Sequence, residues 1–224
     1  MSSASKPFRV GVMLEEVQFC DVVGIDLIGN LSSAALKDAI AFDASLAAFK
    51  DHAVDIQFFF LSTTLDPAKF TTGLRFVPNM TYDDCPRDLD LVLTGGPWLS
   101  HRPPQAAAFI QEAWSKTRVW LTTCTGSVWL AHAGVLNGLK ATTNRAFLPA
   151  AKQTAPQVEW LDQRWVVEEK PYDGEGKGEL WTAGAAGAGK FVSLTPSRIY
   201  FWPLNEMEES LVYFTDLRER QALI

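Results

Sequence analysis

Two patterns of apolar residues alternate along the first 132 positions of the chain. Short, nearly unbroken apolar runs predict buried strands, and longer segments with apolar residues three or four positions apart predict helices. The predicted strands cover residues 8–14, 54–61, 89–94 and 118–122, and the predicted helices cover most of 22–49, 104–116 and 126–132. Strands that are apolar on both faces and alternate with helices indicate an α/β fold, with a mostly parallel sheet between layers of helices.

The pattern is weaker in the rest of the chain, where Gly134 and Gly138 interrupt it. We expect short strands at 140–143, 164–167 and 180–182 and a C-terminal helix that Asn205 caps. Residues 190–203 contain two prolines and are expected to be irregular or extended. No linker-like composition divides the sequence, so we predict one domain over 1–224, with a flexible N-terminus (1–7) and an atypical C-terminal segment (190–224).

Charge and cysteine content exclude several classes of partner. The 224 residues carry a net charge of −6, which argues against nucleic acid or an anionic membrane surface as the partner. No apolar run is long enough to span a membrane, and the N-terminus lacks a secretory signal. Cys20, Cys85 and Cys124 are odd in number and have no CxxC spacing, which argues against a disulfide framework or a zinc site. We therefore expect a cytoplasmic protein that uses no metal.

The most informative segment for chemistry surrounds Cys124. An apolar run, Val119-Trp-Leu, leads to Cys124, and Thr125, Gly126 and Ser127 follow before a helix-compatible run. This order predicts a strand-to-helix elbow, a sharp turn that exposes a nucleophile at the end of a strand. A cysteine at a helix N-terminus is expected to favour the thiolate, and the Thr125 N–H is available to a developing negative charge.

Two other segments also follow predicted strands. Gly95-Gly96 ends one strand and lets the backbone approach a ligand closely. The acidic residues Glu15, Glu16 and Asp21 follow the first strand, and one of these carboxylates could bond the cysteine sulfur or activate water. Sites in open α/β sheets form beyond the carboxyl ends of the strands, where all these residues are expected.

None of the three histidines has an evident local pairing with Cys124. His132 lies two helical turns beyond the cysteine, and His52 and His101 are expected at the surface. A Cys–His pair is therefore not visible in the sequence, although contacts in the fold could form one. Most of the eight tryptophans are expected in the core, and some could line a pocket.

The combined motifs resemble the ThiJ/PfpI superfamily, and most closely its isocyanide hydratase branch. The superfamily resemblance rests on a carboxylate after the first strand, Asp90-Leu-Val-Leu-Thr-Gly-Gly96, Thr122-Thr-Cys-Thr-Gly-Ser127 and Lys140-Ala-Thr-Thr143. The branch is suggested by Glu16-Val-Gln-Phe-Cys-Asp21-Val-Val-Gly24, Asp84-Cys-Pro86, Cys124-Thr-Gly-Ser127, Val158-Glu-Trp160 and Arg164-Trp-Val-Val167. The resemblance implies a flavodoxin-like three-layer sandwich, a homodimer, and no cofactor. It also implies that Cys124 is the nucleophile, Asp21 its acidic partner and Thr125 the residue beside it. The resemblance places Gly95, Gly96 and Gly126 with Asn144 around the oxyanion and substrate, and makes Cys20 and Cys85 structural.

Two positions depart from the family pattern. Asn144 stands where the family usually has a histidine, and asparagine cannot shuttle a proton at neutral pH. Pro196 prevents the long helix that normally follows the Ala/Gly-rich stretch 183–189. The first departure weakens any mechanism that needs a histidine at this position.

The resemblance implies an enzyme that adds water to a small-molecule isocyanide and releases an N-substituted formamide. Asp21 would move protons while Cys124 forms the covalent intermediate. Two alternatives remain: a glyoxalase- or deglycase-like enzyme for 2-oxoaldehydes, and a non-catalytic redox sensor in which Cys124 is oxidised. A DNA-binding regulator is not expected, because 224 residues leave no room for a basic helix-turn-helix module.

Overall fold

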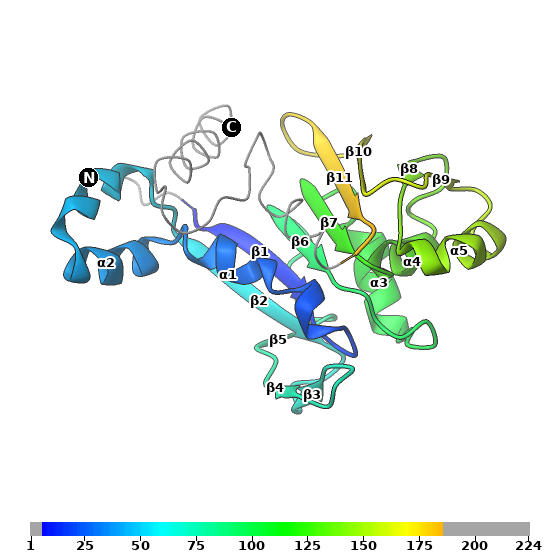
Figure 1. Cartoon of the computed structure of the whole chain (residues 1–224), viewed down its shortest axis with the longest axis horizontal. Coiled ribbons are helices and arrows are strands. Elements are labelled where there is room, and N and C mark those ends of the chain that lie inside the picture. The colour runs from blue at the N-terminus through cyan, green and yellow to red at the C-terminus, as the bar shows by residue number, and fades with distance from the viewer. Residues whose placement is uncertain (1–5, 186–224) are drawn as a thin grey trace.

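A central seven-stranded sheet organises residues 6–185, which are the residues that the computed structural model describes (Figure 1). The strand order is β10-β11-β7-β6-β1-β2-β5. Only β10 runs antiparallel to its neighbour, and the other pairs in this sheet are parallel. The strands are β1 Phe8–Met13, β2 Ile56–Ser62, β5 Met80–Thr81, β6 Leu91–Thr94, β7 Val119–Thr123, β10 Trp165–Lys170 and β11 Gly178–Ala183. This is the flavodoxin-like α/β fold that the sequence resemblance predicts.

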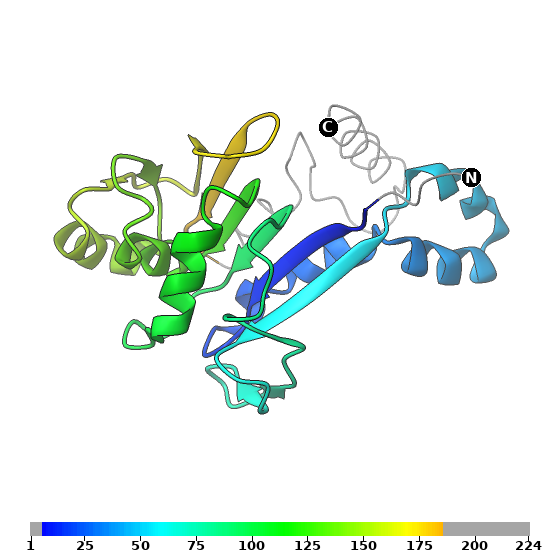
Figure 2. The same ribbon diagram turned by 180° about the vertical axis from the view of Figure 1, so that it is seen from behind.

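Helices cover the sheet from both sides. In Figure 1, α1 lies over β1 and β2, and the view from behind in Figure 2 shows α3 on the opposite face. The helices are α1 Gly24–Gly29, α2 Ser33–Phe42, α3 Pro104–Ala113, α4 Gly126–His132 and α5 Leu148–Thr154, with 3₁₀ segments at Phe19–Asp21, Ala44–His52 and Arg145–Phe147. Two small sheets join β3 Ala68–Lys69 to β4 Arg75–Phe76 and β8 Lys140–Ala141 to β9 Glu159–Trp160.

The buried core lies between α3 and the middle of the sheet. Helix α3 buries Ala106, Phe109, Ile110 and Ala113, which recur at the spacing of one helical face. The four residues of β6 are all buried, as expected for a central strand covered on both faces. This core fixes β6 and β7, whose carboxyl ends carry Gly95-Gly96 and Cys124.

The structure confirms the four strands predicted before residue 132, and α4 has the bounds expected for it. Residues 22–49 are mostly helical, as predicted, and are divided among α1, α2 and the start of a 3₁₀ segment. Ser32 caps α2 by accepting a hydrogen bond from the Ala35 N–H, at 3.1 Å, which starts a new helix there. Strands β3, β4, β5 and β9 were missed because each is only two residues long.

Some predictions fall outside the described residues. They concern residues 1–5, the irregular segment 190–203 and the helix expected from Asn205 onward. The single domain predicted over 1–224 likewise concerns the whole chain, and it stays a prediction. Within 6–185, no helix has the length and apolar character needed to cross a membrane.

Candidate active site

Cys124 lies in the turn between β7 and α4 and is 7% exposed. Its φ angle is +53°, in the left-handed region that costs a non-glycine residue about 1–3 kcal/mol. Two contacts hold its carbonyl oxygen in this conformation: the Thr143 hydroxyl donates to it at 3.0 Å and the Asn144 N–H at 3.3 Å. The fold therefore maintains an unfavourable backbone conformation at the predicted site residue.

Gly126 lets the start of α4 approach the end of β6. A Cβ atom at this position would collide with the Thr94 carbonyl oxygen and would lie 2.9 Å from the Gly95 carbonyl oxygen. Both obstacles are backbone atoms, which cannot move aside as a flexible side chain can. A glycine is therefore required at position 126, and it brings Cys124 beside the glycine pair.

Asp21 ends the 3₁₀ segment Phe19–Asp21 and is 3% exposed. Its Oδ2 accepts a hydrogen bond from the Gly96 N–H at 3.0 Å, and its backbone carbonyl accepts one from the Thr123 hydroxyl at 2.9 Å. Its Oδ1 is buried and has no hydrogen-bond partner among residues 6–185. One oxygen of the carboxylate is thus positioned by the protein, and the other has no hydrogen bond to residues 6–185.

Gly96 marks the point where the predicted residues converge. A Cβ atom placed there would lie 2.8 Å from Asp21 Oδ2, 2.9 Å from Cys124 Cβ and 2.9 Å from the Thr125 nitrogen. The carboxyl ends of β6 and β7 and the segment after β1 therefore enclose one small space, as the parallel sheet predicts. Because the Gly96 N–H already binds Asp21, it orients the carboxylate in this structure.

Burial changes the proton affinities of Asp21 and Cys124. It raises the pKa of Asp21 to about 6, although the hydrogen bond from Gly96 and the interaction with Cys124 lower it in part. Burial and the Asp21 charge raise the pKa of Cys124 above its ordinary value of 9.0, and contacts with Asn144 and Thr125 oppose this. At neutral pH the pair is therefore a carboxylate beside a thiol.

This result corrects the expectation that the helix N-terminus would favour a thiolate. Helix α4 is only seven residues long, so its dipole is small. The sequence argument also left out burial and the negative charge of Asp21, which both disfavour a second anion at this position.

Asn144 is in direct contact with the cysteine sulfur. Its Nδ2 donates to Cys124 Sγ at 3.4 Å, while its Oδ1 accepts from the Ala146 N–H at 3.0 Å and caps the 3₁₀ segment Arg145–Phe147. The cap uses the amide oxygen, so the amide nitrogen faces the sulfur. Asn144 can therefore stabilise negative charge on sulfur but cannot accept its proton.

Thr125 acts on the site in two ways. Its backbone N–H interacts with the Cys124 side chain and lowers the pKa of the thiol. Its hydroxyl donates to the Pro97 carbonyl oxygen at 3.1 Å and so holds the segment that follows the glycine pair. The hydroxyl thus has a structural role, and the backbone N–H is the group that faces the Cys124 sulfur.

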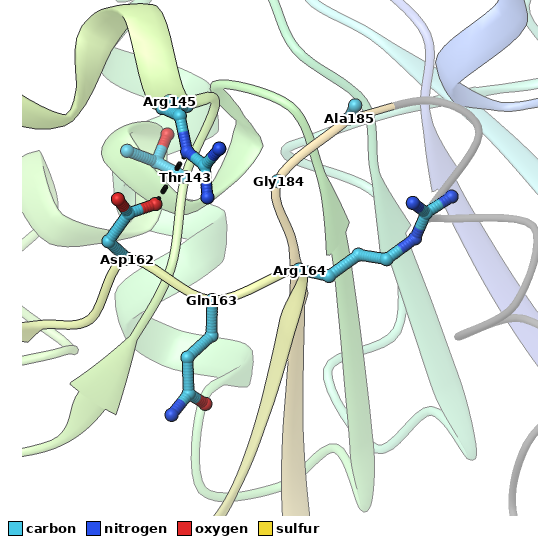
Figure 3. Close-up of a pocket in the computed structure, with 7 residues that line it drawn as sticks. All are labelled: Thr143, Arg145, Asp162, Gln163, Arg164, Gly184 and Ala185. Atoms are coloured by element: carbon cyan, nitrogen blue, oxygen red, sulfur yellow. Dashed lines mark hydrogen bonds and ion pairs between the residues drawn. The ribbon is translucent and has the colours of Figure 1, made fainter.

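A cavity of about 360 Å³ opens over Cys124. It is lined by Gln18, Thr71, Gly96, Pro97, Trp98, Leu99, Ser100, Cys124, Thr125 and Phe147. A second cavity, of about 320 Å³, lies around Thr143, Arg145, Asp162 and Gly184 (Figure 3). In the second cavity the Arg145 guanidinium pairs with the Asp162 carboxylate at 2.7 Å. The sequence-predicted residues Cys124, Thr125 and Gly96 line the first cavity, which makes it the candidate site.

Comparison with known proteins supports the flavodoxin-like fold described above. The family model described as the DJ-1/PfpI family matches residues 37–182. The chain belongs to the DJ-1/PfpI family. An isonitrile hydratase from Pseudomonas putida is 34% identical to it over 96 residues, which are 42% of this chain and 42% of the relative. The chain thus matches less than half the length of that curated relative.

Solved structures of the same fold include proteins that are described as having different roles. A ThiJ/PfpI family protein from Pseudomonas syringae superposes with a TM-score of 0.62 at 17% identity, over 97% of this chain and 87% of that protein. An AraC family transcriptional regulator from Pseudomonas putida gives a TM-score of 0.62 at 15% identity, over 94% of this chain and 100% of the other. At these identities the likeness shows the shared DJ-1/PfpI fold and leaves the chemistry to the site itself.

The other acidic candidates lie away from the cysteine. Glu15 Oε2 accepts hydrogen bonds from the Thr63 hydroxyl and N–H and lies 3.7 Å from His101 Nε2. Burial raises the pKa of Glu15, but its contacts with His101 and Thr63 lower it overall. Glu16 pairs with Lys69 at 3.3 Å. Of the three acidic residues after β1, only Asp21 interacts with Cys124 in the described part of the chain.

The histidines and the two other cysteines lie in several environments. His101 was expected at the surface, but it is half-buried because its ring packs against the Trp129 ring. His132 is exposed and accepts from Arg102 Nε at 3.1 Å. Cys85 is buried with its pKa raised to about 12, as expected of a structural cysteine. Cys20 is exposed, and its structural role stays a prediction.

Sequence reasoning missed Trp98 and Phe147 as individual wall residues of the cavity. Most tryptophans were expected in the core, and Trp120 and Trp129 do lie there, but Trp98 is 57% exposed. A signal was available, because Trp98 comes two positions after Gly96 and Phe147 three positions after Asn144. Bulky aromatic residues so close to site residues are candidates for pocket walls.

Proposed function

We propose that this DJ-1/PfpI protein is an isocyanide hydratase-like lyase, which adds water to an isocyanide and releases an N-substituted formamide. The observation that carries the proposal is the buried Asp21 carboxylate, which has one unpaired oxygen and interacts with the protonated thiol of Cys124. This pair can deliver a nucleophile and a proton to one carbon atom, which is what hydration of a terminal isocyanide carbon requires.

In the first step, the Cys124 sulfur bonds to the terminal carbon of the isocyanide. Asp21 takes the thiol proton as the S–C bond forms and delivers it to the same carbon. The product is a thioimidate, Cys124–S–CH=N–R, which contains all the atoms of the thiol and the isocyanide. Because the pKa of Asp21 is about 6, it is charged at neutral pH and can accept this proton.

In the second step, water adds to the thioimidate carbon. Asp21 accepts a proton from the attacking water and passes it to the imine nitrogen, which gives a tetrahedral adduct that carries hydroxyl and amine groups. Breakage of the S–C bond then forms the formamide carbonyl, and the sulfur regains its proton. One isocyanide and one water are consumed for each formamide released, and no cofactor is needed.

The remaining site residues support these steps in different ways. Asn144 Nδ2 and the Thr125 N–H face the sulfur and stabilise the negative charge that passes through it. Gly96 orients Asp21, and Gly126 permits the close approach of α4 to β6. We assign no step to Gly95, whose replacement would crowd Val17 and Val22.

Similarity to the isonitrile hydratase from Pseudomonas putida favours this reaction over the alternatives. A glyoxalase-like mechanism is disfavoured because Asn144 cannot shuttle protons. A redox sensor needs an exposed thiol with a lowered pKa, whereas the thiol of Cys124 is 7% exposed and its pKa is raised. We propose a homodimer from the family resemblance and a cytoplasmic location from the odd number of cysteines in the sequence.

The test is formamide release from an alkyl or aryl isocyanide at pH 7.5. Wild-type protein is expected to produce formamide, and the Cys124→Ala variant is expected to produce none above the buffer rate. The matched control is Cys85→Ala, which removes a buried thiol outside the cavity. Methylglyoxal is offered to the same three proteins, and its Cys124-dependent consumption without formamide release would favour the glyoxalase alternative.

A further inference from the structure

The walls of the cavity over Cys124 differ in character from its floor. The floor holds Cys124 and Thr125, and the walls include Pro97, Trp98, Leu99 and Phe147 together with neutral polar side chains. Among the described residues that line it, none carries a charge when the Cys124 thiol is protonated. A charged substituent that entered this cavity would lose its hydration without gaining an ion-pair partner.

Two large aromatic side chains of the wall are unusually exposed. Trp98 is 57% exposed and Phe147 is 39% exposed, although each lines a cavity above a buried thiol. Trp98 comes from the segment after β6, and Phe147 ends the 3₁₀ segment that Asn144 caps. Exposed aromatic surface at the mouth of a cavity is characteristic of a binding site for an apolar group.

The backbone of both aromatic residues is tied to the site. The Trp98 carbonyl oxygen accepts from the His101 N–H at 2.9 Å and from Arg102 Nη1 at 3.3 Å, and the preceding Pro97 is held by Thr125. The Phe147 N–H donates to the Asn144 carbonyl oxygen at 2.8 Å. Little backbone freedom is therefore lost when a substituent binds between these walls, which favours affinity.

We propose that Trp98 and Phe147 determine substrate specificity, so that the site prefers uncharged isocyanides with a ring-sized apolar substituent and disfavours small or anionic ones. This inference rests on the proposed hydratase function. The rings bury apolar surface of the substituent, which a methyl group cannot supply. An anionic substituent is also repelled by the negative charge of Asp21, which is buried next to the Cys124 thiol.

The first test compares kcat/KM for phenyl isocyanide, methyl isocyanide and the isocyanoacetate anion. Phenyl isocyanide is expected to exceed each of the others by at least about tenfold. In Trp98→Ala and in Phe147→Ala the phenyl-to-methyl ratio is expected to fall by about tenfold, mainly through KM. The control is Trp165→Ala, which removes a 45% exposed tryptophan on β10 outside the cavity. An unchanged ratio in both wall variants would overturn the inference.

The second test does not depend on turnover. Cys124 and the exposed Cys20 are alkylated in the same sample with N-phenylmaleimide, N-methylmaleimide, iodoacetamide or iodoacetate, and the peptides are quantified by mass spectrometry. Relative to Cys20, Cys124 is expected to favour the phenyl over the methyl reagent and iodoacetamide over iodoacetate. Trp98→Ala is expected to reduce the phenyl preference.

The two tests distinguish the specificity of the cavity from the proposed hydratase function. Selective alkylation of Cys124 without formamide release would contradict the hydratase and leave the specificity of the cavity standing. Formamide release with the same reagent preferences at Cys124 and Cys20, and with no preference for phenyl isocyanide, would contradict the specificity and leave the hydratase standing.

Discussion

Two buried ionisable side chains, at opposite ends of β7, show how differently this fold treats charge. Asp21 is 3% exposed and lies beside the last residue of β7, where its carbonyl oxygen binds the Thr123 hydroxyl. Lys170 is 4% exposed and ends β10, close in space to the N-terminal end of β7. Its Nζ donates to the carbonyl oxygens of Trp114 and Thr117, each at 2.6 Å. Burial is almost equal at the two positions, but hydrogen bonding is not.

Every donor of the Lys170 ammonium can be satisfied, because a third carbonyl oxygen, that of Pro171, lies 3.0 Å away. The Trp114 ring also faces the ammonium, with its centroid 4.9 Å from Nζ. Asp21 instead has one oxygen paired and one unpaired. A saturated buried charge holds segments together, whereas an unsaturated one retains the capacity to react. We therefore assign structure to Lys170 and chemistry to Asp21.

The largest expected effect is the loss of activity in Asp21→Asn. An amide cannot take the proton of the Cys124 thiol, so formamide release is expected to fall by about 10²- to 10⁴-fold while the protein stays folded. The matched control is Glu15→Gln, since Glu15 also follows β1 but is held by Thr63 and His101. An Asp21→Asn variant as active as the control would remove Asp21 from the mechanism.

Lys170→Met is expected to show the opposite behaviour. It removes the donor shared by three buried carbonyl groups and should destabilise the fold by about 3–5 kcal/mol, or roughly 10 °C in Tm. Below its Tm the variant should retain the wild-type kcat/KM. The control is Lys177→Met, because Lys177 is exposed and pairs with Glu169 at the surface. Calorimetry beside activity checks this, and a loss of activity without a loss of stability would contradict the assignment.

The pH dependence of the free energy of unfolding tests the unpaired charge of Asp21 independently of activity. Its expected effect is smaller than those of the two substitutions. The pKa of Asp21 is raised from 3.8 to about 6 in the folded protein, so the folded state binds this proton more tightly than the unfolded state. Its stabilising effect is present below pH 3.8 and is lost as the pH rises through 6, by about 3 kcal/mol in total. Denaturant unfolding should show this loss in wild-type protein relative to Asp21→Asn. Parallel pH curves for the two proteins would contradict it.

The same proton is expected to limit catalysis in acid. Since protonated Asp21 cannot accept the thiol proton, kcat/KM should decrease about tenfold per pH unit below a pKa of about 6. Initial rates between pH 4.5 and 8 with one isocyanide measure this directly. A profile that is flat across pH 6 would show that Asp21 is not the proton acceptor.

The smallest expected effect concerns Asn144, which opposes the influence of Asp21 on the sulfur. In Asn144→Ala the sulfur loses its 3.4 Å donor, so the pKa of Cys124 should rise further and activity should fall by up to about tenfold. The pH dependence of Cys124 alkylation reports the pKa. An unchanged pKa would mean that this contact does not stabilise the thiolate.

Local sequence patterns predict the framework of this site well. The apolar residues before Cys124 and the small ones after it indicate the turn between β7 and α4, and the double glycine indicates the end of β6. Parallel strands then bring the two ends together. Asp21 was singled out through family resemblance, because no local pattern distinguishes it from Glu15 and Glu16. The structure makes that distinction, since only Asp21 shares the space beside Gly96.

What the sequence could not predict depends on contacts between distant segments. Lys170 belongs to a charged stretch of β10 that looks like an exposed edge, and its burial depends on carbonyl groups more than fifty positions away. The thiolate expected at Cys124 was wrong for a similar reason, since burial and Asp21 outweigh a local helix end. Trp98 and Phe147 line the same cavity because Thr125 and Asn144 hold their two segments beside Cys124.

The most direct test of the central claim is peptide mass spectrometry of acid-quenched protein during turnover of an isocyanide. Wild-type protein is expected to carry a mass gain of one isocyanide molecule on Cys124, because the thioimidate contains all of its atoms, and Asp21→Asn is expected to carry none. Formamide release by wild-type protein with no modification on Cys124, or with the modification on Cys20, would contradict the account.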